Sequence, residues 1–285
     1  MKNGRRFQPI RDCSRTLKEL AMKKFYQLFL VLLVLTSQLF GQTVEIKKMT
    51  EILDTVTEDS IVIFDLDNTI MEASQTLGSD QWFDHRIGQL KNQGLAVEAA
   101  VEQSVSEWVE INRKGKVNLV EKSTPGIVRS LQDSGIPTMG LTARPTVFVD
   151  RSLEQLRELG VPLYRHTVTD ETIDIAGPKE NAHFEEGLMS VGGNNKGTIL
   201  VQFLNKLELN PGRVLFVDDK VKNTKNVEEA MQATAFPYFG FRYGAADAKV
   251  KAFDAKLADF EFGYFSDYGV VLSDATAKKL MNQSN

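Results

Sequence analysis

Three short apolar runs, each ending abruptly in polar residues, constrain the fold of this chain more than any other feature. They occupy residues 61–64, 136–141 and 214–217, and helical patterns separate them. Mainly apolar runs of this length are typical of parallel strands that are buried on both faces. Strands that alternate with helices predict a three-layer α/β fold, in which a Rossmann-like parallel sheet carries helices on both faces.

The polar residues that end these runs are expected to meet at one place. In open parallel sheets, ligands bind beyond the carboxyl ends of the strands. The sequence therefore predicts a single site that gathers the residues at those ends. In chain order they are Asp65, Asp67, Thr142, Arg144, Asp218 and Asp219.

The pair Asp65 and Asp67 is the strongest chemical signal in the sequence. Two carboxylates separated by one residue can do different work at one site, because one can attack while the other exchanges a proton. A calcium-binding loop is the alternative interpretation. Loops of the EF-hand type need further acids downstream and a Gly at a fixed position, and neither follows Thr69. The pair therefore indicates catalysis.

The segment Phe64-Asp65-Leu66-Asp67-Asn68-Thr69 resembles the first motif of phosphatases of the haloacid dehalogenase-like (HAD) superfamily. The other motifs follow in the family's order, with Thr142 in the second, Lys196 in the third and Asp218-Asp219 in the fourth. The resemblance covers about residues 60–240. Segments 78–83 and 218–220 make the chain most similar to an uncharacterised subfamily of exported bacterial HAD-like proteins.

The resemblance implies a phosphomonoester hydrolase that works through an aspartyl-phosphate intermediate. Asp65 would be the nucleophile, and Asp67 would protonate the leaving oxygen and then activate water. The phosphate-binding residues implied by the resemblance are Thr142, Lys196 and Asn68. A phosphotransferase on the same scaffold and a catalytically silent binding protein are the alternative functions.

The resemblance also implies a Mg²⁺ cofactor. Its ligands would be the carboxylates of Asp65 and Asp218 and the backbone carbonyl of Asp67, with Asp219 acting behind them or through water. Mg²⁺ suits such a site because it prefers carboxylates, waters and substrate phosphate as ligands. Without a cation, the clustered negative charges would repel one another strongly.

A helix-rich segment at about residues 72–122 lies between the first two strands, where this superfamily places a cap. We therefore expect residues 42–285 to form one HAD-like hydrolase domain with a small helical cap inserted at 72–122, acting on a small phosphorylated substrate. Within the cap, Trp82 and Phe83 belong either to the core or to a platform for the substrate. Arg144 either touches phosphate or pairs with a neighbouring acid.

The N-terminus has the pattern of a secretory signal peptide, preceded by a basic extension at residues 1–21. Met22-Lys23-Lys24 provides the basic start, residues 28–35 form an apolar run, and Gly41 is a small residue at the exit. The apolar run is shorter than the roughly 18 residues that a membrane span needs. A buried helix and an uncleaved anchor are the alternatives. Cleavage after Gly41 predicts a periplasmic or secreted protein that no longer contacts a membrane.

Cleavage would also change the charge of the protein. The removed piece carries eight of the 34 Lys and Arg residues and two of the 38 Asp and Glu residues, which leaves a net charge of −10. Such a surface disfavours nucleic acid and anionic membranes, which bind basic patches. Cys13, the single cysteine, is removed as well, which excludes a thiol nucleophile. The oligomeric state stays open.

Two local predictions concern segments outside the motifs. Apolar residues at helical spacing predict a helix over residues 44–56, and the Gly192-Gly193-Asn194-Asn195 segment predicts the turn of a β-hairpin.

Overall fold

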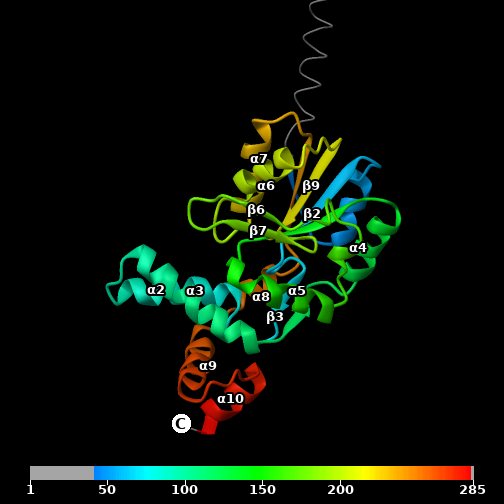
Figure 1. Cartoon of the computed structure of the whole chain (residues 1–285). Coiled ribbons are helices and arrows are strands. Elements are labelled where there is room, and N and C mark those ends of the chain that lie inside the picture. Colours follow the sequence, from blue (N-terminus) through cyan, green and yellow to red (C-terminus); the bar gives the residue numbers. More distant parts are fainter. Residues whose placement is uncertain (1–41, 284–285) are drawn as a thin grey trace, which may run out of the picture. The chain divides into compact units, whose positions relative to one another are not determined.

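The computed structural model describes residues 42–283, so the predicted signal peptide and basic extension lie outside the described residues. The described residues contain an eight-stranded sheet in the order β1-β10-β9-β2-β5-β8-β7-β6 (Figure 1). The strands from β1 to β8 in this order are parallel, and β7 and β6 extend the sheet as an antiparallel edge. The predicted α/β class with a mainly parallel sheet is confirmed. The strands are β1 (Gln42–Ile46), β2 (Ser60–Phe64), β5 (Thr138–Thr142), β6 (Ile173–Ile175), β7 (Ala182–Glu185), β8 (Leu188–Ser190), β9 (Arg213–Asp218) and β10 (Tyr238–Tyr243).

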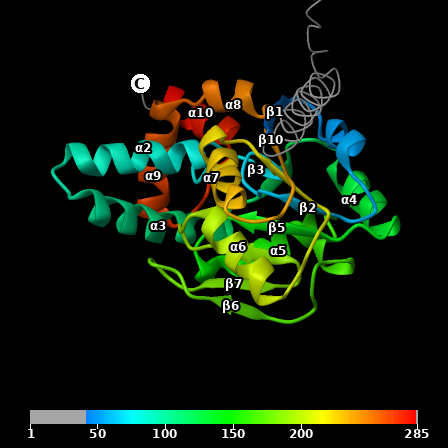
Figure 2. The ribbon, with the colours of Figure 1, turned by 90° about the horizontal axis from the view of Figure 1, so that it is seen from above.

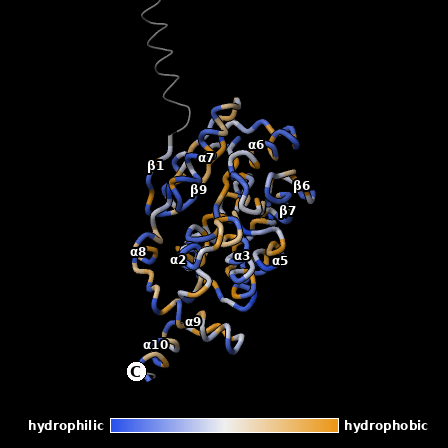
Figure 3. Tube along the Cα trace, turned by 90° about the vertical axis from the view of Figure 1, so that its left-hand side faces the viewer, coloured by the Kyte–Doolittle hydropathy of each residue, from blue (hydrophilic) through white to orange (hydrophobic). Residues whose placement is uncertain are grey.

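Helices cover both faces of this sheet, which explains why its strands lack polar alternation. Side chains of β2 point to opposite faces in turn, so Val62 and Phe64 join one apolar cluster while Ile61 and Ile63 join another. The first cluster includes residues of η1, α4 and α5, and the second includes residues of α6 and α7. The apolar strand segments lie in the interior of the trace (Figure 3). These helices are η1 (Met49–Thr55), α4 (Thr124–Asp133), α5 (Val149–Glu158), α6 (Lys196–Lys206) and α7 (Val221–Gln232).

Between β2 and β5 the chain leaves the sheet and forms a helical hairpin. Strands β3 (Met71–Ala73) and β4 (Val117–Leu119) pair antiparallel at its base. Helices α2 (Asp80–Asn92) and α3 (Val97–Lys114) project from that base side by side (Figure 1). Ser79 starts α2, because its hydroxyl accepts the backbone N–H of Trp82 at 3.1 Å and satisfies a free helix donor.

The C-terminal helices pack beside this hairpin (Figure 2). Two carboxylates join them to the segment that enters α2. Asp274 accepts the backbone N–H of Thr76 at 2.6 Å, and Glu261 accepts that of Leu77 at 2.8 Å. The hairpin is therefore held by the far end of the chain as well as by its own base. These helices are α8 (Asp247–Lys251), α9 (Ala255–Tyr268) and α10 (Asp274–Gln283).

Two local predictions from the sequence are wrong. The predicted helix over residues 44–56 is instead strand β1 followed by the short 3-10 helix η1, because residues 42–46 pair with β10. The predicted hairpin turn at Gly192-Gly193 is the loop that leads into α6. The hairpin between β7 and β8 turns at Glu186-Gly187, whose φ angles of 46° and 80° suit a tight hairpin turn.

Within residues 42–283, every helix is too short or too polar to cross a membrane.

Candidate active site

Asp65 and Lys196 lie in contact at the carboxyl end of the sheet. Asp65 follows β2, and its backbone N–H donates to Val217 of β9 at 2.8 Å, which fixes the position of its side chain. Lys196 is the first residue of α6, and its ammonium donates to Asp65 and, at 2.7 Å, to Asp218. All three side chains are at least nine-tenths buried. One cation therefore serves two buried carboxylates.

A third carboxylate, Asp219, completes a compact cluster. One oxygen from each of Asp65, Asp218 and Asp219 lies within 4.8 Å of the others. Asn223 donates to both oxygens of Asp218 at 3.0 Å, which orients that carboxylate. The backbone N–H of Asp219 donates to Thr69 Oγ1, whose O–H donates in turn to Asp65. A buried set of oxygen donors with this spacing fits a hard divalent cation such as Mg²⁺.

The electrostatics of the cluster agree with this fit. Burial raises the pKa of Asp219 to about 8, and the charges of Asp65 and Asp218 add to the rise. Burial is also the main cause of the raised pKa of Asp65, which the charge of Lys196 opposes. Burial disfavours the charged form of Lys196, but the two carboxylates outweigh that effect and raise its pKa. Lys196 contacts only two of the three carboxylates, so a second positive charge would stabilise the cluster.

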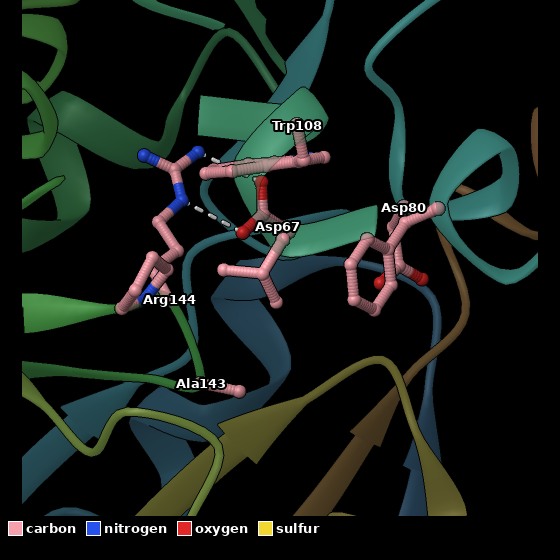
Figure 4. A pocket seen from close by; sticks show the side chains of 8 residues that line it. Asp67, Asp80, Trp108, Ala143 and Arg144 are labelled. Atoms are coloured by element: carbon pink, nitrogen blue, oxygen red, sulfur yellow. Dashed lines mark hydrogen bonds and ion pairs between the residues drawn. The ribbon is translucent and has the colours of Figure 1, made fainter. Parts of the chain in front are cut away.

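Asp67 pairs with Arg144 (Figure 4). Arg144 Nε lies 2.8 Å from Asp67 Oδ2, and Nη2 lies 2.8 Å from Oδ1. Arg144 is anchored by Ser152 at 2.9 Å and by Gln155 at 2.8 Å. Burial opposes ionisation of Asp67, but the charge and hydrogen bonds of Arg144 outweigh it and lower the pKa of Asp67. Of the two sequence-based interpretations of Arg144, the structure has the pairing with an acid.

The predicted phosphate-binding residues Thr142 and Asn68 lie at the same end of the sheet. Thr142 ends β5, and its hydroxyl oxygen accepts the backbone N–H of Arg144 at 3.3 Å. Asn68 has a φ of 60°, and its backbone N–H donates to Met71 O at 2.7 Å. Its side-chain Nδ2 is buried and has no partner among the described residues. A buried donor without a partner is costly, so the side chain of Asn68 is better placed to bind an anion than its backbone.

Three residues near the site were not assigned a role by the sequence. Lys220 follows the acidic pair of β9 and forms an ion pair at 2.8 Å with Asp80 in the first turn of α2. Trp108 of α3 lies over Arg144, with 5.3 Å between its ring centroid and the guanidinium carbon. Asp80 and Lys220 lie in segments 78–83 and 218–220, which carry the subfamily resemblance without assigning a role to either residue, and no motif marks Trp108.

Trp82 and Phe83, for which the sequence left two roles open, have different surroundings in the helical hairpin. Trp82 is fully buried in a cluster shared with α9, where its ring centroid lies 5.6 Å from that of Phe262. Phe83 lines a pocket beside Asp67.

Comparisons with known proteins identify relatives over most of the chain. The family described as "Protein of unknown function (DUF2608)" matches residues 43–278. A Chlamydia pneumoniae protein is 27% identical over 207 residues, which covers 73% of this chain and 78% of the relative. A Chlamydia trachomatis protein is 22% identical over 246 residues, which covers 85% of this chain and 92% of the relative. Both relatives are named, provisionally, as outer membrane proteins.

Solved structures give weaker matches. A haloacid dehalogenase-like hydrolase from Streptococcus pneumoniae is 13% identical and covers 69% of this chain and all of that chain, with a TM-score of 0.41. A HAD-superfamily hydrolase from Geobacter sulfurreducens is 14% identical, with a TM-score of 0.34. The match covers 67% of this chain and 95% of that chain.

Proposed function

This chain belongs to the DUF2608 family, and from the geometry of its carboxylate site we propose that it is a Mg²⁺-dependent phosphomonoester hydrolase. The proposal includes an aspartyl-phosphate formed on Asp65. The observation that carries it is the contact of Asp65 with Lys196 inside a buried cluster of three carboxylates, with Asp67 close enough that its charge adds to the raised pKa of Asp65. The motif resemblance to HAD-like phosphatases supports the same chemistry.

In the first step, the carboxylate of Asp65 attacks phosphorus and the bond to the leaving oxygen breaks. Lys196 holds Asp65 in position and neutralises the incoming phosphoryl group. Thr142 and the side-chain Nδ2 of Asn68, which has no partner among the described residues, donate hydrogen bonds to phosphoryl oxygens. Asp67 supplies the proton that the leaving oxygen needs, which matters most when the product is an alcohol.

In the second step, water attacks the phosphorus of the aspartyl-phosphate and the bond to Asp65 breaks. Asp67 accepts the proton of that water. Arg144 favours the ionised form of Asp67, which is the form that a base requires. Inorganic phosphate leaves and Asp65 is regenerated.

Asp65, Asp218 and Asp219 would hold Mg²⁺, together with the backbone carbonyl of Asp67. The ion would neutralise negative charge on the phosphoryl group and on the clustered carboxylates. The fit rests on the buried oxygen donors within 4.8 Å of one another.

We include the cap and export in the proposal. The hairpin of α2 and α3, at about the predicted residues 72–122, would cover the site and restrict it to small phosphate esters. The basic, apolar and small-residue pattern of residues 22–41 supports export from the cytoplasm. The names of the chlamydial relatives agree with a location outside the cytoplasm.

The test is an assay of purified protein with p-nitrophenyl phosphate, with Mg²⁺ or with excess chelator. We expect release of nitrophenol and of inorganic phosphate in equal amounts, only with Mg²⁺. Asp65→Asn should abolish both. The matched control is Asp59→Asn, which changes an exposed acid at the opposite end of β2 and should retain activity.

The same assay separates the alternative functions. If added alcohols lower the phosphate released per nitrophenol, the protein transfers phosphoryl groups to acceptors other than water. If neither product forms with any phosphate ester or divalent cation, the hydrolase proposal is wrong and a silent binding role remains.

A further inference from the structure

A pocket with mainly apolar walls opens directly beside Asp67 (Figure 4). Phe83 of α2, Val105 and Trp108 of α3, and Pro145 after β5 contribute its apolar walls. The pocket encloses about 470 Å³ of space free of protein atoms, part of which is open to solvent. Because Asp67 would protonate the leaving oxygen, this pocket is where the rest of the leaving group would lie.

The charged groups on the pocket wall already have charged partners. Arg144 uses Nε and Nη2 for Asp67, and its Nη1 donates to Ser152 and Gln155. Asp80 is paired with Lys220 at 2.8 Å. The lining therefore offers apolar surface and few free hydrogen-bonding groups.

The chemistry of the wall discriminates between classes of leaving group. A sugar would find few partners beyond the spare lone pairs of the already paired Asp67 and Asp80, and each hydroxyl left without a partner costs roughly 10-fold or more in affinity. A leaving group with a second phosphate or a carboxylate would be repelled by the negative charges of Asp67 and Asp80. An aromatic ring has no hydroxyl group to leave without a partner and no charge to be repelled. It would also gain contact with Phe83 and Trp108.

We propose that the substrate is a monophosphate ester of an uncharged apolar alcohol or phenol, about the size of one aromatic ring. The inference rests on the proposed hydrolase function and adds the class of leaving group to it. The residues that select this class are Phe83, Val105 and Trp108.

A binding experiment tests the pocket without catalysis. Phenylphosphonate and methylphosphonate carry the same charged head and differ in the apolar group. Calorimetry with the purified protein and Mg²⁺ should show phenylphosphonate binding roughly 10- to 100-fold more tightly, from the apolar area that the ring buries. Equal affinities would overturn the inference.

Matched variants locate the effect. Val105→Thr keeps the side-chain shape but adds a hydroxyl to the pocket wall, so it should reduce the preference for phenylphosphonate several-fold and leave methylphosphonate unchanged. Val97→Thr, on the exposed start of the same helix, should change neither affinity. If Val105→Thr weakens both ligands equally, the pocket does not hold the apolar group.

Turnover gives a second readout. Benzyl phosphate and glycerol 1-phosphate both release primary alcohols, so they differ mainly in the group that enters the pocket. We expect kcat/KM to be at least 10-fold higher for benzyl phosphate. A higher value for glycerol 1-phosphate, glucose 6-phosphate or adenosine 5′-monophosphate would overturn the inference and leave the hydrolase proposal intact. Preferential binding of phenylphosphonate without hydrolysis of any ester would support the pocket and contradict the hydrolase proposal.

Discussion

Both oxygens of the Asp67 carboxylate are held by the guanidinium of Arg144, at 2.8 Å from Nε and 2.8 Å from Nη2. Two parallel hydrogen bonds fix the plane of the carboxylate as well as its distance, which a lysine cannot do. Arg144 is therefore expected to act on the reaction by positioning Asp67.

Arg144→Lys should keep the charge but lose this orientation. We expect kcat to fall about 10- to 100-fold with KM little changed, since small misplacements of a catalytic group are costly. Steady-state kinetics with an alkyl phosphate would measure the effect. Arg151→Lys is the control, because Arg151 pairs with Glu154 and Glu158 on the same helix, α5, away from Asp67. Equal losses in both variants would argue against a positioning role.

Substitution of Asp67 should separate the two steps of the reaction. Asp67→Asn should slow alkyl phosphates by roughly 10²–10⁴-fold, because an alkoxide leaves poorly without a proton. Nitrophenolate leaves unaided, so p-nitrophenyl phosphate should give a product burst comparable to the enzyme concentration and then slow turnover. The trapped protein should carry phosphate that is acid-stable and sensitive to hydroxylamine. Asp65→Asn should show no burst, and loss of both substrates without trapped phosphate in Asp67→Asn would contradict these roles.

Mg²⁺ should stabilise the folded protein even without substrate. A ligand at 100 times its Kd adds about 2.7 kcal/mol to the free energy of unfolding, which raises the Tm of a chain of this size by several degrees. Thermal unfolding with Mg²⁺ and with chelator would measure the shift. Asp218→Asn should reduce it strongly, whereas Asp59→Asn should retain it. An identical Tm in Mg²⁺ and in chelator would count against the metal site.

Glu261 should make the stability of the protein depend on pH. Burial raises the pKa of Glu261 to about 8 in the folded protein, from an ordinary value of 4.5. Above pH 4.5 the unfolded chain loses this proton while the folded protein keeps it, so the free energy of unfolding falls as the pH rises toward 8. Glu261→Gln can still accept the N–H of Leu77 and does not ionise.

Denaturant unfolding at pH 5 and pH 8 tests this effect. The free energy of unfolding of Glu261→Gln, taken relative to that of the native sequence, should be higher at pH 8 than at pH 5 by up to a few kcal/mol. Asp267 is an exposed acid on α9, so Asp267→Asn should have the same free energy of unfolding as the native sequence at both pH values. A constant difference between the Glu261→Gln variant and the native sequence would show that Glu261 is ionised in the folded protein.

Export should leave a protein that begins near Gln42. N-terminal sequencing of the processed protein would show this, and Leu33→Arg should block processing because a charge interrupts the apolar run. Gln8→Arg, in the basic extension, is the control and should be processed normally. Soluble cytoplasmic protein with Met22 intact would be the contrary outcome.

The sequence predicted those parts of the site that depend on the backbone alone. Strands β2, β5 and β9 end where the apolar runs end, so the convergence of Asp65, Thr142 and Asp218 follows from the rule for parallel sheets. The partner of Arg144 could not be predicted, because it depends on which of several nearby groups the side chain reaches. Trp82 and Phe83 are neighbours in the sequence, yet their side chains point about 100° apart on the helix, so one is buried and the other lines the pocket.

The contribution of the C-terminal helices was beyond sequence reasoning for a different reason. Their apolar residues predict helices with a buried face but do not specify which surface they cover. In the structure, the contacts of Glu261 with Leu77 and of Asp274 with Thr76 identify that surface as the entrance to α2.

These contacts also determine the order in which a newly made molecule becomes complete. Synthesis proceeds from the N-terminus, so the carboxylate cluster is complete in sequence once Asp219 has been added. Glu261 and Asp274 are added some forty residues later or more. Until then, the backbone N–H groups of Leu77 and Thr76 lack the acceptors that they have in the folded unit, and the hairpin beside the pocket is not held from this side. For a chain that crosses a membrane unfolded, assembly would therefore finish only when its final helices have arrived on the other side.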